Sequence, residues 1–237
     1  MTPRDNGGMA AADGTGEKPP RQPAFNLTPV VKILLLTNLL IYLAVNFGPG
    51  WLGKMLVGVL AFTPGFFLLD GPFSLHGWAG LFGHMFLHIQ GMHFLVNMGG
   101  LLAFGTPVER ALGTVRFIAL YVFSGMIGIG LDGFLAGAPN DVYLGASAAV
   151  TGLFGGVLMI LFGAGPDRRA IRRAGGRERI MTLVQIVAIV VVLNVVIGLA
   201  GMPGVQGSIA WVAHLGGLGT GLALYPLLAR PAPGPSA

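Results

Sequence analysis

The stretch Tyr143-Leu-Gly-Ala-Ser-Ala-Ala-Val-Thr-Gly-Leu-Phe-Gly-Gly156 opens an apolar segment that runs on to Gly163. It carries no charge, and apart from Tyr143 its only polar side chains are the hydroxyls of Ser147 and Thr151. Glycine and alanine recur along it, as they do where membrane helices pack closely. The segment therefore predicts a helix inside a membrane bundle.

Composition extends this prediction to the whole chain. Of its 237 residues, 54% are hydrophobic and only 10% are charged, against about 25% charged in a typical soluble domain. The charges fall in short clusters between apolar runs, several of which approach the roughly 20 residues that a membrane-spanning helix needs. We therefore expect an all-α, multi-pass integral membrane protein.

Six apolar spans can be counted between two polar tails. Residues 1–29 read as a disordered cytoplasmic tail, residues 30–229 as a six-helix membrane domain, and residues 230–237 as a short C-terminal tail. The predicted spans are Val30–Phe47, Met92–Pro107, Thr114–Ala136, Gly145–Gly163, Ile180–Ala200 and Ser208–Leu228.

The basic residues test this count. With six spans and a cytoplasmic N-terminus, 13 of the 14 Lys and Arg residues lie on the inner side, and only Lys54 lies outside. Inner-side positive charge is what orients membrane proteins. We therefore read the net charge of +5 as loop charge and expect no nucleic-acid partner.

The outer segment Gly48–Gly91 is unlike an ordinary polar loop. Eight Trp and Phe side chains lie in it, interrupted by Gly and Pro. Aromatic side chains favour the membrane interface, so we expect a loop half-embedded in the outer leaflet. Capping of a substrate and plain anchoring are both open as its role.

Ser147 and His214 are the polar residues most suggestive of chemistry inside the predicted spans. Ser147 starts the fourth span, where unpaired backbone N–H groups could stabilise an oxyanion. His214 lies near the outer end of the sixth span, and Gly217 and Gly221 follow broadly on its face. If the two glycine-faced helices pack closely, His214 can take the proton of Ser147. A helix-capping serine and a histidine bonded between helices are the structural alternatives.

His93 and Asn97 form a second polar pair at the outer end of the second span. Their spacing of four residues puts them on one helical face, and both side chains can donate to an oxyanion. His84 and His88 have the same spacing and could ligate metal or make local hydrogen bonds, and we expect no metal and no cofactor. Because the sequence has no cysteine, thiolate sites are excluded.

Three other polar positions have structural interpretations. Asp132, near the outer end of the third span, is given a structural or solvated role, and no acidic residue is placed to orient His214, which predicts a dyad. Gln185 and Asn194 are expected to bond between helices, and Glu109 with Arg110 to form a structural turn.

Taken in order, these motifs resemble those of the rhomboid intramembrane proteases. They are His84-Met-Phe-Leu-His88, His93-Phe-Leu-Val-Asn97, Val108-Glu-Arg-Ala-Leu-Gly113, Gly145-Ala-Ser147 and His214-Leu-Gly-Gly, and the likeness covers about residues 30–229. The resemblance implies a six-helix rhomboid-like bundle, with Ser147 as nucleophile and His214 as general base and acid. It implies an oxyanion hole of His93, Asn97 and the Ser147 N–H, with His88 as a supporting residue.

The same resemblance implies substrates that are single-span membrane proteins, cut near the outer membrane face. A bacterial inner membrane is the expected location, and the oligomeric state is left open. The chain departs from the family pattern at Ala148, where glycine is usual, at Thr151, where an aromatic is frequent, and at Trp78-Ala79, where Trp-Arg is frequent.

Two alternatives to a protease are kept. A non-catalytic rhomboid-like protein that binds membrane proteins for quality control would usually lack Ser147 or His214. A transporter would need polar groups through the whole membrane thickness, whereas those here gather near the outer side.

Overall fold

The computed structural model describes residues 27–71, 73–135, 137–162, 176–200 and 210–229. Most of the two predicted tails lies outside the described residues, as do the start of the sixth predicted span and the basic loop that contains Arg168 to Arg173. The described residues are helical, apart from short connections and one isolated β-bridge between Phe62 and Tyr143. The expectation of an all-α chain is thus met for these residues.

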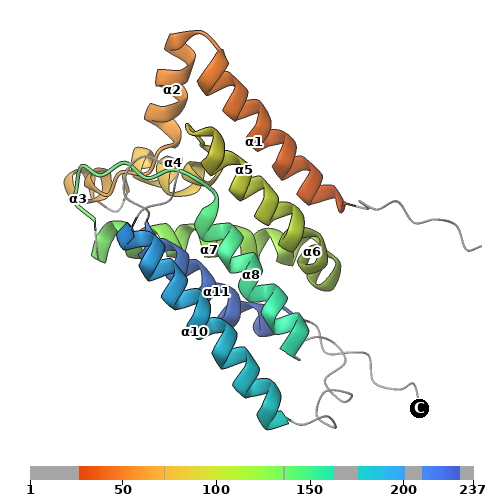
Figure 1. The fold of residues 1–237 in the computed structure, drawn as a ribbon. Helices are drawn as coiled ribbons and strands as arrows, with labels where there is room; N and C mark the ends of the chain where they lie inside the picture. Colours follow the sequence, from red (N-terminus) through yellow and green to blue (C-terminus); the bar gives the residue numbers. More distant parts are fainter. Residues whose placement is uncertain (1–26, 72, 136, 163–175, 201–209, 230–237) are drawn as a thin grey trace, which may run out of the picture.

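Each predicted span contains a helix (Figure 1). By length and hydropathy alone, two of the described helices, α1 and α7, could cross a membrane. The second span continues past its predicted end at Pro107, because α5, a π-helical turn at Leu101–Gly105 and α6 follow one another without a gap. The helices are α1 (Pro29–Phe47), α5 (Gly91–Gly100), α6 (Thr106–Leu112), α7 (Thr114–Leu135), α8 (Ser147–Phe162), α10 (Gly176–Ala200) and α11 (Trp211–Leu228).

The outer segment folds into short helices, as its Gly and Pro content predicts. They are α2 (Gly50–Leu60), α3 (Gly65–Asp70), α4 (Leu75–Gly83) and the 3₁₀ turn η1 (His84–Phe86). Its aromatic side chains divide into two sets: Phe62 is fully buried, whereas Trp51 and Phe73 are 68% and 90% exposed. One set holds the segment to the bundle, and the other is free to meet lipid.

Glu109 fixes the start of α1. Its two carboxylate oxygens accept hydrogen bonds from the backbone N–H groups of Val30 and Val31, at 3.2 and 3.1 Å. The first N–H groups of a helix have no partner inside it, and a carboxylate there also complements the helix dipole. Glu109 is buried, so it does more than the structural turn predicted for it: it ties α6 to α1.

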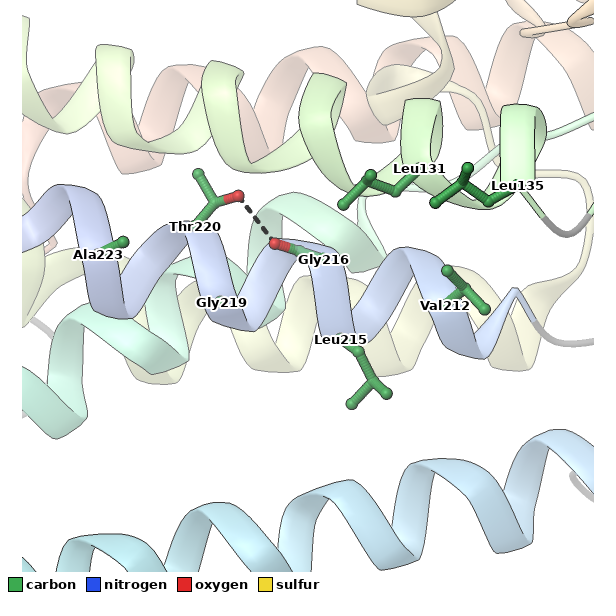
Figure 2. Close-up of a pocket in the computed structure, with 8 residues that line it drawn as sticks. All are labelled: Leu131, Leu135, Val212, Leu215, Gly216, Gly219, Thr220 and Ala223. Atoms are coloured by element: carbon green, nitrogen blue, oxygen red, sulfur yellow. Dashed lines mark hydrogen bonds between the residues drawn. The ribbon is translucent and has the colours of Figure 1, made fainter.

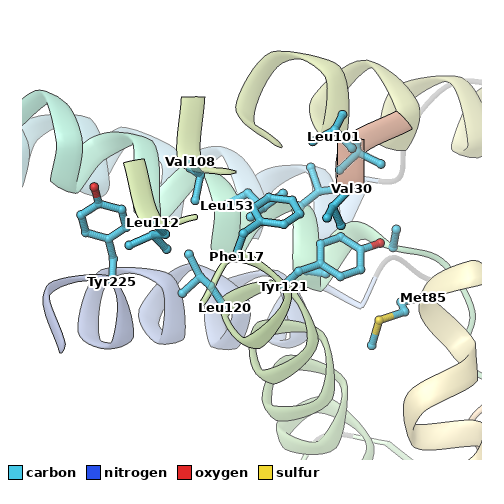
Figure 3. Packing of buried hydrophobic residues seen from close by; sticks show 14 residues of the cluster. Val30, Met85, Leu101, Val108, Leu112, Phe117, Leu120, Tyr121, Leu153 and Tyr225 are labelled. Carbon is cyan, nitrogen blue, oxygen red and sulfur yellow. The ribbon is translucent and has the colours of Figure 1, made fainter. Parts of the chain in front are cut away.

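A hydrophobic core lies between α1, α6, α7, α8 and α11 (Figure 3). Phe117, Leu120 and Tyr121 of α7 are almost wholly buried there, against Leu153 of α8 and Tyr225 of α11. Large side chains therefore fill the space between the helices at this end of the bundle.

Helices α7, α8 and α11 pack most closely of all the elements. A Cβ added to Gly221 would collide with the carbonyl oxygen of Gly152, and one added to Gly217 with that of Ala148. Gly155 likewise lies against the backbone of α11, because a Cβ added to it would be 2.8 Å from the Leu218 carbonyl oxygen. The prediction that glycine faces bring α8 and α11 together is confirmed.

A different face of α11 is open. Its residues Val212, Leu215, Gly216, Gly219, Thr220 and Ala223 line an apolar groove of about 520 Å³ with Leu131 and Leu135 of α7 (Figure 2). The one hydrogen bond drawn there runs from the Thr220 hydroxyl to the Gly216 carbonyl, at 2.8 Å. An added Cβ on Gly219 would meet nothing within 4 Å. Gly219 and Gly221 therefore lie on the same helix, but Gly219 faces open space and Gly221 is packed against α8.

We expect Gly221→Ala to destabilise the protein and Gly219→Ala to leave it unchanged or slightly stabilised. The first methyl forces α8 and α11 apart, and overpacking of this kind costs about 1–3 kcal/mol. The second removes only the helix penalty of glycine, about 1 kcal/mol. Unfolding of the two variants in detergent micelles, followed by circular dichroism against denaturant, measures the difference. Equal stabilities would contradict the glycine contact.

Candidate active site

The glycine contacts set the register of α8 against α11. Ala148 faces Gly217, and Gly152 faces Gly221 four residues later on both helices, so the two helices run parallel. His214 lies one turn before Gly217, which brings it level with the residues from Gly145 to Ser147. Ser147 and His214 are both partly buried. Two positions 67 residues apart in the sequence thus lie at about the same level of the bundle.

Ser147 is the first residue of α8. The chain reaches it through Gly145, whose φ of 112° lies in the region that favours glycine. The helix begins to bond to itself where the Val150 N–H donates to the Ala146 carbonyl at 2.9 Å. The N–H groups of Ser147 and the next two residues therefore stand at the helix N-terminus, which suits a developing negative charge.

The His93 imidazole packs against the backbone just before the serine. A Cβ added to Gly145 would lie in contact with the His93 ring, 2.7 Å from its Nε2. Residue 145 must therefore be glycine for two reasons, its φ and its neighbour. His93 therefore lies directly beside the segment that leads to Ser147.

Asn97 is buried one turn further along α5. Its side-chain amide donates one hydrogen bond to the His93 carbonyl, at 2.8 Å. An amide NH₂ has two hydrogens, so one donor remains for a second partner. The His93 and Asn97 pair thus shares one helical face, as its spacing predicts.

His84 and His88 hold the loop that carries the serine. The Gly145 N–H donates to the His84 carbonyl at 2.8 Å, and the Ala146 N–H donates to the His88 Nε2 at 3.2 Å. His84 bonds through its Nδ1 to the Leu81 carbonyl at 3.0 Å. Of the two interpretations left open for these histidines, the structure shows the local hydrogen bonds. The His88 ring also meets that of His93, with centroids 5.3 Å apart.

Burial keeps these two supporting histidines neutral. It lowers the pKa of His88 to about 3, and the neighbouring imidazoles of His93 and His84 add to this effect. Burial also lowers the pKa of His84 to about 4, against the opposing influence of its backbone hydrogen bonds. A neutral His88 is required for its Nε2 to accept a hydrogen bond from Ala146.

Ala148 and Thr151, where the chain departs from the family pattern, both have defined neighbours in the structure. The Ala148 methyl faces Gly128 of α7, since an added Cβ on Gly128 would lie 2.8 Å from it. A glycine on α7 thus accommodates the extra methyl. The Thr151 hydroxyl donates to the Ser147 and Ala148 carbonyls at 3.0 and 2.9 Å. It therefore stays with its own helix beside Gly217.

The role of Asp132 is the one that is hardest to predict from the sequence. It is only 6% exposed and accepts a hydrogen bond from the Ala213 N–H at 3.1 Å, so its role is structural, and the solvated alternative is wrong. Gln185 lies exposed on α10, and the Asn194 side chain lies outside the described residues. A carboxylate near the end of an apolar helix was the only available signal for Asp132.

The family model of the rhomboid domain matches residues 75–231, which include every predicted site residue. The chain belongs to the rhomboid family.

Relatives agree with this assignment. The rhomboid is 37% identical over 86 residues to the Bacillus subtilis (strain 168) protein described as "Putative rhomboid protease YdcA", covering 36% of this chain and 43% of that protein. It is 36% identical over 156 residues to "RHOMBOID-like protein 4" of Arabidopsis thaliana, covering 65% of this chain and 35% of that one. The matched region spans less than half the length of these relatives.

Membership has consequences for the fold. A rhomboid domain belongs to an integral membrane protein, which accounts for the large apolar side chains exposed along α1 and α10, such as Leu36, Leu40, Ile189 and Val192. In water these surfaces would be unfavourable, whereas against lipid they are the expected exterior.

We expect the stability of this rhomboid to fall as the pH is lowered from 6.5 towards 4. His84 and His88 have folded-state pKa values of about 4 and 3, below the ordinary value of 6.5. In this window the unfolded chain binds more protons, so each pH unit costs about 1.4 kcal/mol per histidine. Denaturant unfolding at pH 6.5, 5.5 and 5.0 measures the slope.

His88→Asn keeps an acceptor for the Ala146 N–H but cannot titrate. The unfolding free energy of this variant should therefore fall less per pH unit than that of the wild type. His76→Asn is the matched control, because His76 is exposed on α4. A His88→Asn slope equal to that of the wild type would refute the assigned role of burial.

Proposed function

We propose that this rhomboid is an intramembrane serine endopeptidase that uses Ser147 and His214 as a catalytic dyad. The observation that supports this most directly is the parallel glycine contact of α8 and α11, in which Gly217 meets Ala148 and Gly221 meets Gly152. This register puts a histidine at the level of a serine that starts a helix, and a serine needs such a base before it becomes an effective nucleophile.

In the acylation step, His214 takes the proton of the Ser147 hydroxyl while the serine oxygen attacks the carbonyl carbon of a peptide bond. The tetrahedral oxyanion forms near the α8 N-terminus, where the Ser147 N–H, His93 and Asn97 are the donors. His214 then gives the proton to the departing amine, and the acyl group remains on Ser147. Preorganised donors of this kind contribute about 10²–10³-fold each to kcat.

In the second step, His214 takes a proton from water, whose oxygen attacks the acyl carbon. The ester to Ser147 breaks, the serine recovers its proton, and the carboxylate product leaves. His84 and His88 take no part in proton transfer. They hold Gly145 and Ala146 through the hydrogen bonds of 2.8 and 3.2 Å described above, as supporting residues.

The proposal includes a location and a substrate class. We place the chain as a six-span bundle in a bacterial inner membrane, with its N-terminus in the cytoplasm and α8 starting below the outer face. α8 has only 16 residues, about 24 Å of helix, so it need not reach both surfaces of a hydrocarbon core about 30 Å thick. Substrates would be single-span membrane proteins cut near the outer end of their helix.

The outer segment would lie half-embedded beside this site. Its exposed Trp51, Phe73 and Trp78 suit the interface, and Phe62 joins the Tyr143 backbone by hydrogen bonds of 2.9 and 2.8 Å. Because Tyr143 leads to Ser147, the segment is joined to the proposed active site and does more than anchor the chain.

We expect Ser147→Ala and His214→Ala each to abolish labelling of purified protein by a fluorophosphonate probe and cleavage of a fluorogenic transmembrane substrate in liposomes. Removal of either member of a serine–base pair typically costs 10³-fold or more. His76→Ala, which changes a histidine on the surface of α4, is the control and should keep wild-type rates.

The results separate the alternative functions. Cleavage that persists in both Ser147→Ala and His214→Ala would exclude the dyad. A folded wild type that neither labels nor cleaves would favour a non-catalytic binding protein. Proton flux in liposomes that persists in Ser147→Ala would favour a transporter.

The orientation can be tested independently, because the chain has no native cysteine. We expect Asn140→Cys, in the exposed loop before α8, to react with a membrane-impermeant maleimide added outside intact spheroplasts. Thr114→Cys, exposed at the start of α7, should react only after permeabilisation. The opposite pattern would invert the proposed topology.

A further inference from the structure

We propose that Asp132 is a positioning residue for the general base, fixing the first turn of α11 and with it His214 relative to the loop that carries Ser147. This inference rests on the proposed function, since it assigns a role within that mechanism. Asp132 would act through the backbone of α11, from its place near the outer end of α7.

The first turn of α11 is capped from another helix. The residue before α11, Ala210, makes no side-chain capping bond. The N–H of Ala213, the third residue of the helix, instead donates to the Asp132 Oδ1 at 3.1 Å, in a buried setting. A carboxylate at this end satisfies an otherwise unpaired donor and complements the positive end of the helix dipole.

This bond lies one residue before His214. Ala213 is fully buried, and its carbonyl oxygen lies 2.5 Å from where a Cβ on Gly128 would be. Gly128 and Asp132 are four residues apart and so share a face of α7. The turn that leads into His214 is therefore seated on α7 at two points, one a backbone contact and the other a charged hydrogen bond.

The same carboxylate also lies near the serine side of the site. Burial, together with the nearby carboxylates of Asp132 and Asp141, raises the pKa of the Tyr143 hydroxyl. The Tyr143 backbone is itself fixed by its pair of hydrogen bonds with Phe62. Four residues later comes Ser147. One buried carboxylate thus bonds to the helix of the base and acts electrostatically on a residue in the approach to the nucleophile.

Such a link matters because a serine and its base must be held to a fraction of an ångström. A displacement of about 1 Å in a catalytic group can cost about 100-fold in rate. Thr151, at the position where the family often has an aromatic, bonds instead to its own helix. The position of His214 must therefore come from elsewhere, and Asp132 supplies it through the turn before it.

The test compares Asp132→Ala with Asp132→Asn in two measurements. Amide hydrogen exchange of peptides from residues 210–217 reports the first turn of α11, and it does not require activity. The rate of Ser147 labelling by a fluorophosphonate, with kcat and KM for the transmembrane substrate, reports positioning. Asp70→Ala, at an exposed position that ends α3, is the matched carboxylate control.

For Asp132→Ala we expect faster exchange in the 210–217 peptides, unchanged exchange in α1, and labelling and kcat reduced by about 10- to 100-fold with KM within about twofold. Asp132→Asn keeps an acceptor oxygen and should recover most of both. Asp70→Ala should match the wild type.

Wild-type exchange in Asp132→Ala would overturn the cap, and faster exchange with wild-type labelling would overturn the positioning role. Loss of labelling in Asp132→Asn equal to that in Asp132→Ala, with exchange restored, would also overturn it. An unlabelled wild type would instead refute the proposed protease, while the exchange measurement would still decide whether Asp132 fixes the turn.

Discussion

The backbone contact between α8 and α11 is the constraint on which the rest of the structure depends. In a bilayer, the lipid tails are as apolar as the helix side chains, so the hydrophobic effect does not drive helices together. Helix association there relies on close packing and hydrogen bonds. Gly152, Gly217 and Gly221 remove the side chains that would hold these helices apart. The parallel register follows from that contact, and the register brings His214 level with Ser147.

Much of this could be predicted from the sequence because membrane helices leave strong local signals. The apolar runs place every long helix to within a few residues, and the spacing of Gly217 and Gly221 identifies the face of α11 that meets α8. The spacing of His93 and Asn97 puts them on one face, as the structure has them. These are properties of single helices, because the helical period determines which side chains point to the same face.

What could not be predicted are contacts that join distant segments through one polar group. Glu109 bonds to N–H groups 78 and 79 residues away, and Asp132 to one 81 residues away. No local pattern encodes such partners. The second span was also predicted too short, because Pro107 reads as a helix end, whereas a π-helical turn before it lets the helix continue.

The meeting of Ala148 with Gly128 has an evolutionary consequence. The narrow space between α7 and α8 at this level holds a single methyl group, which this chain carries on residue 148. Residue 128 is confined from two sides, because a Cβ there would meet the Ala213 carbonyl oxygen as well as the Ala148 methyl. Among related sequences, alanine beside the serine should therefore occur only together with glycine at the facing position of α7.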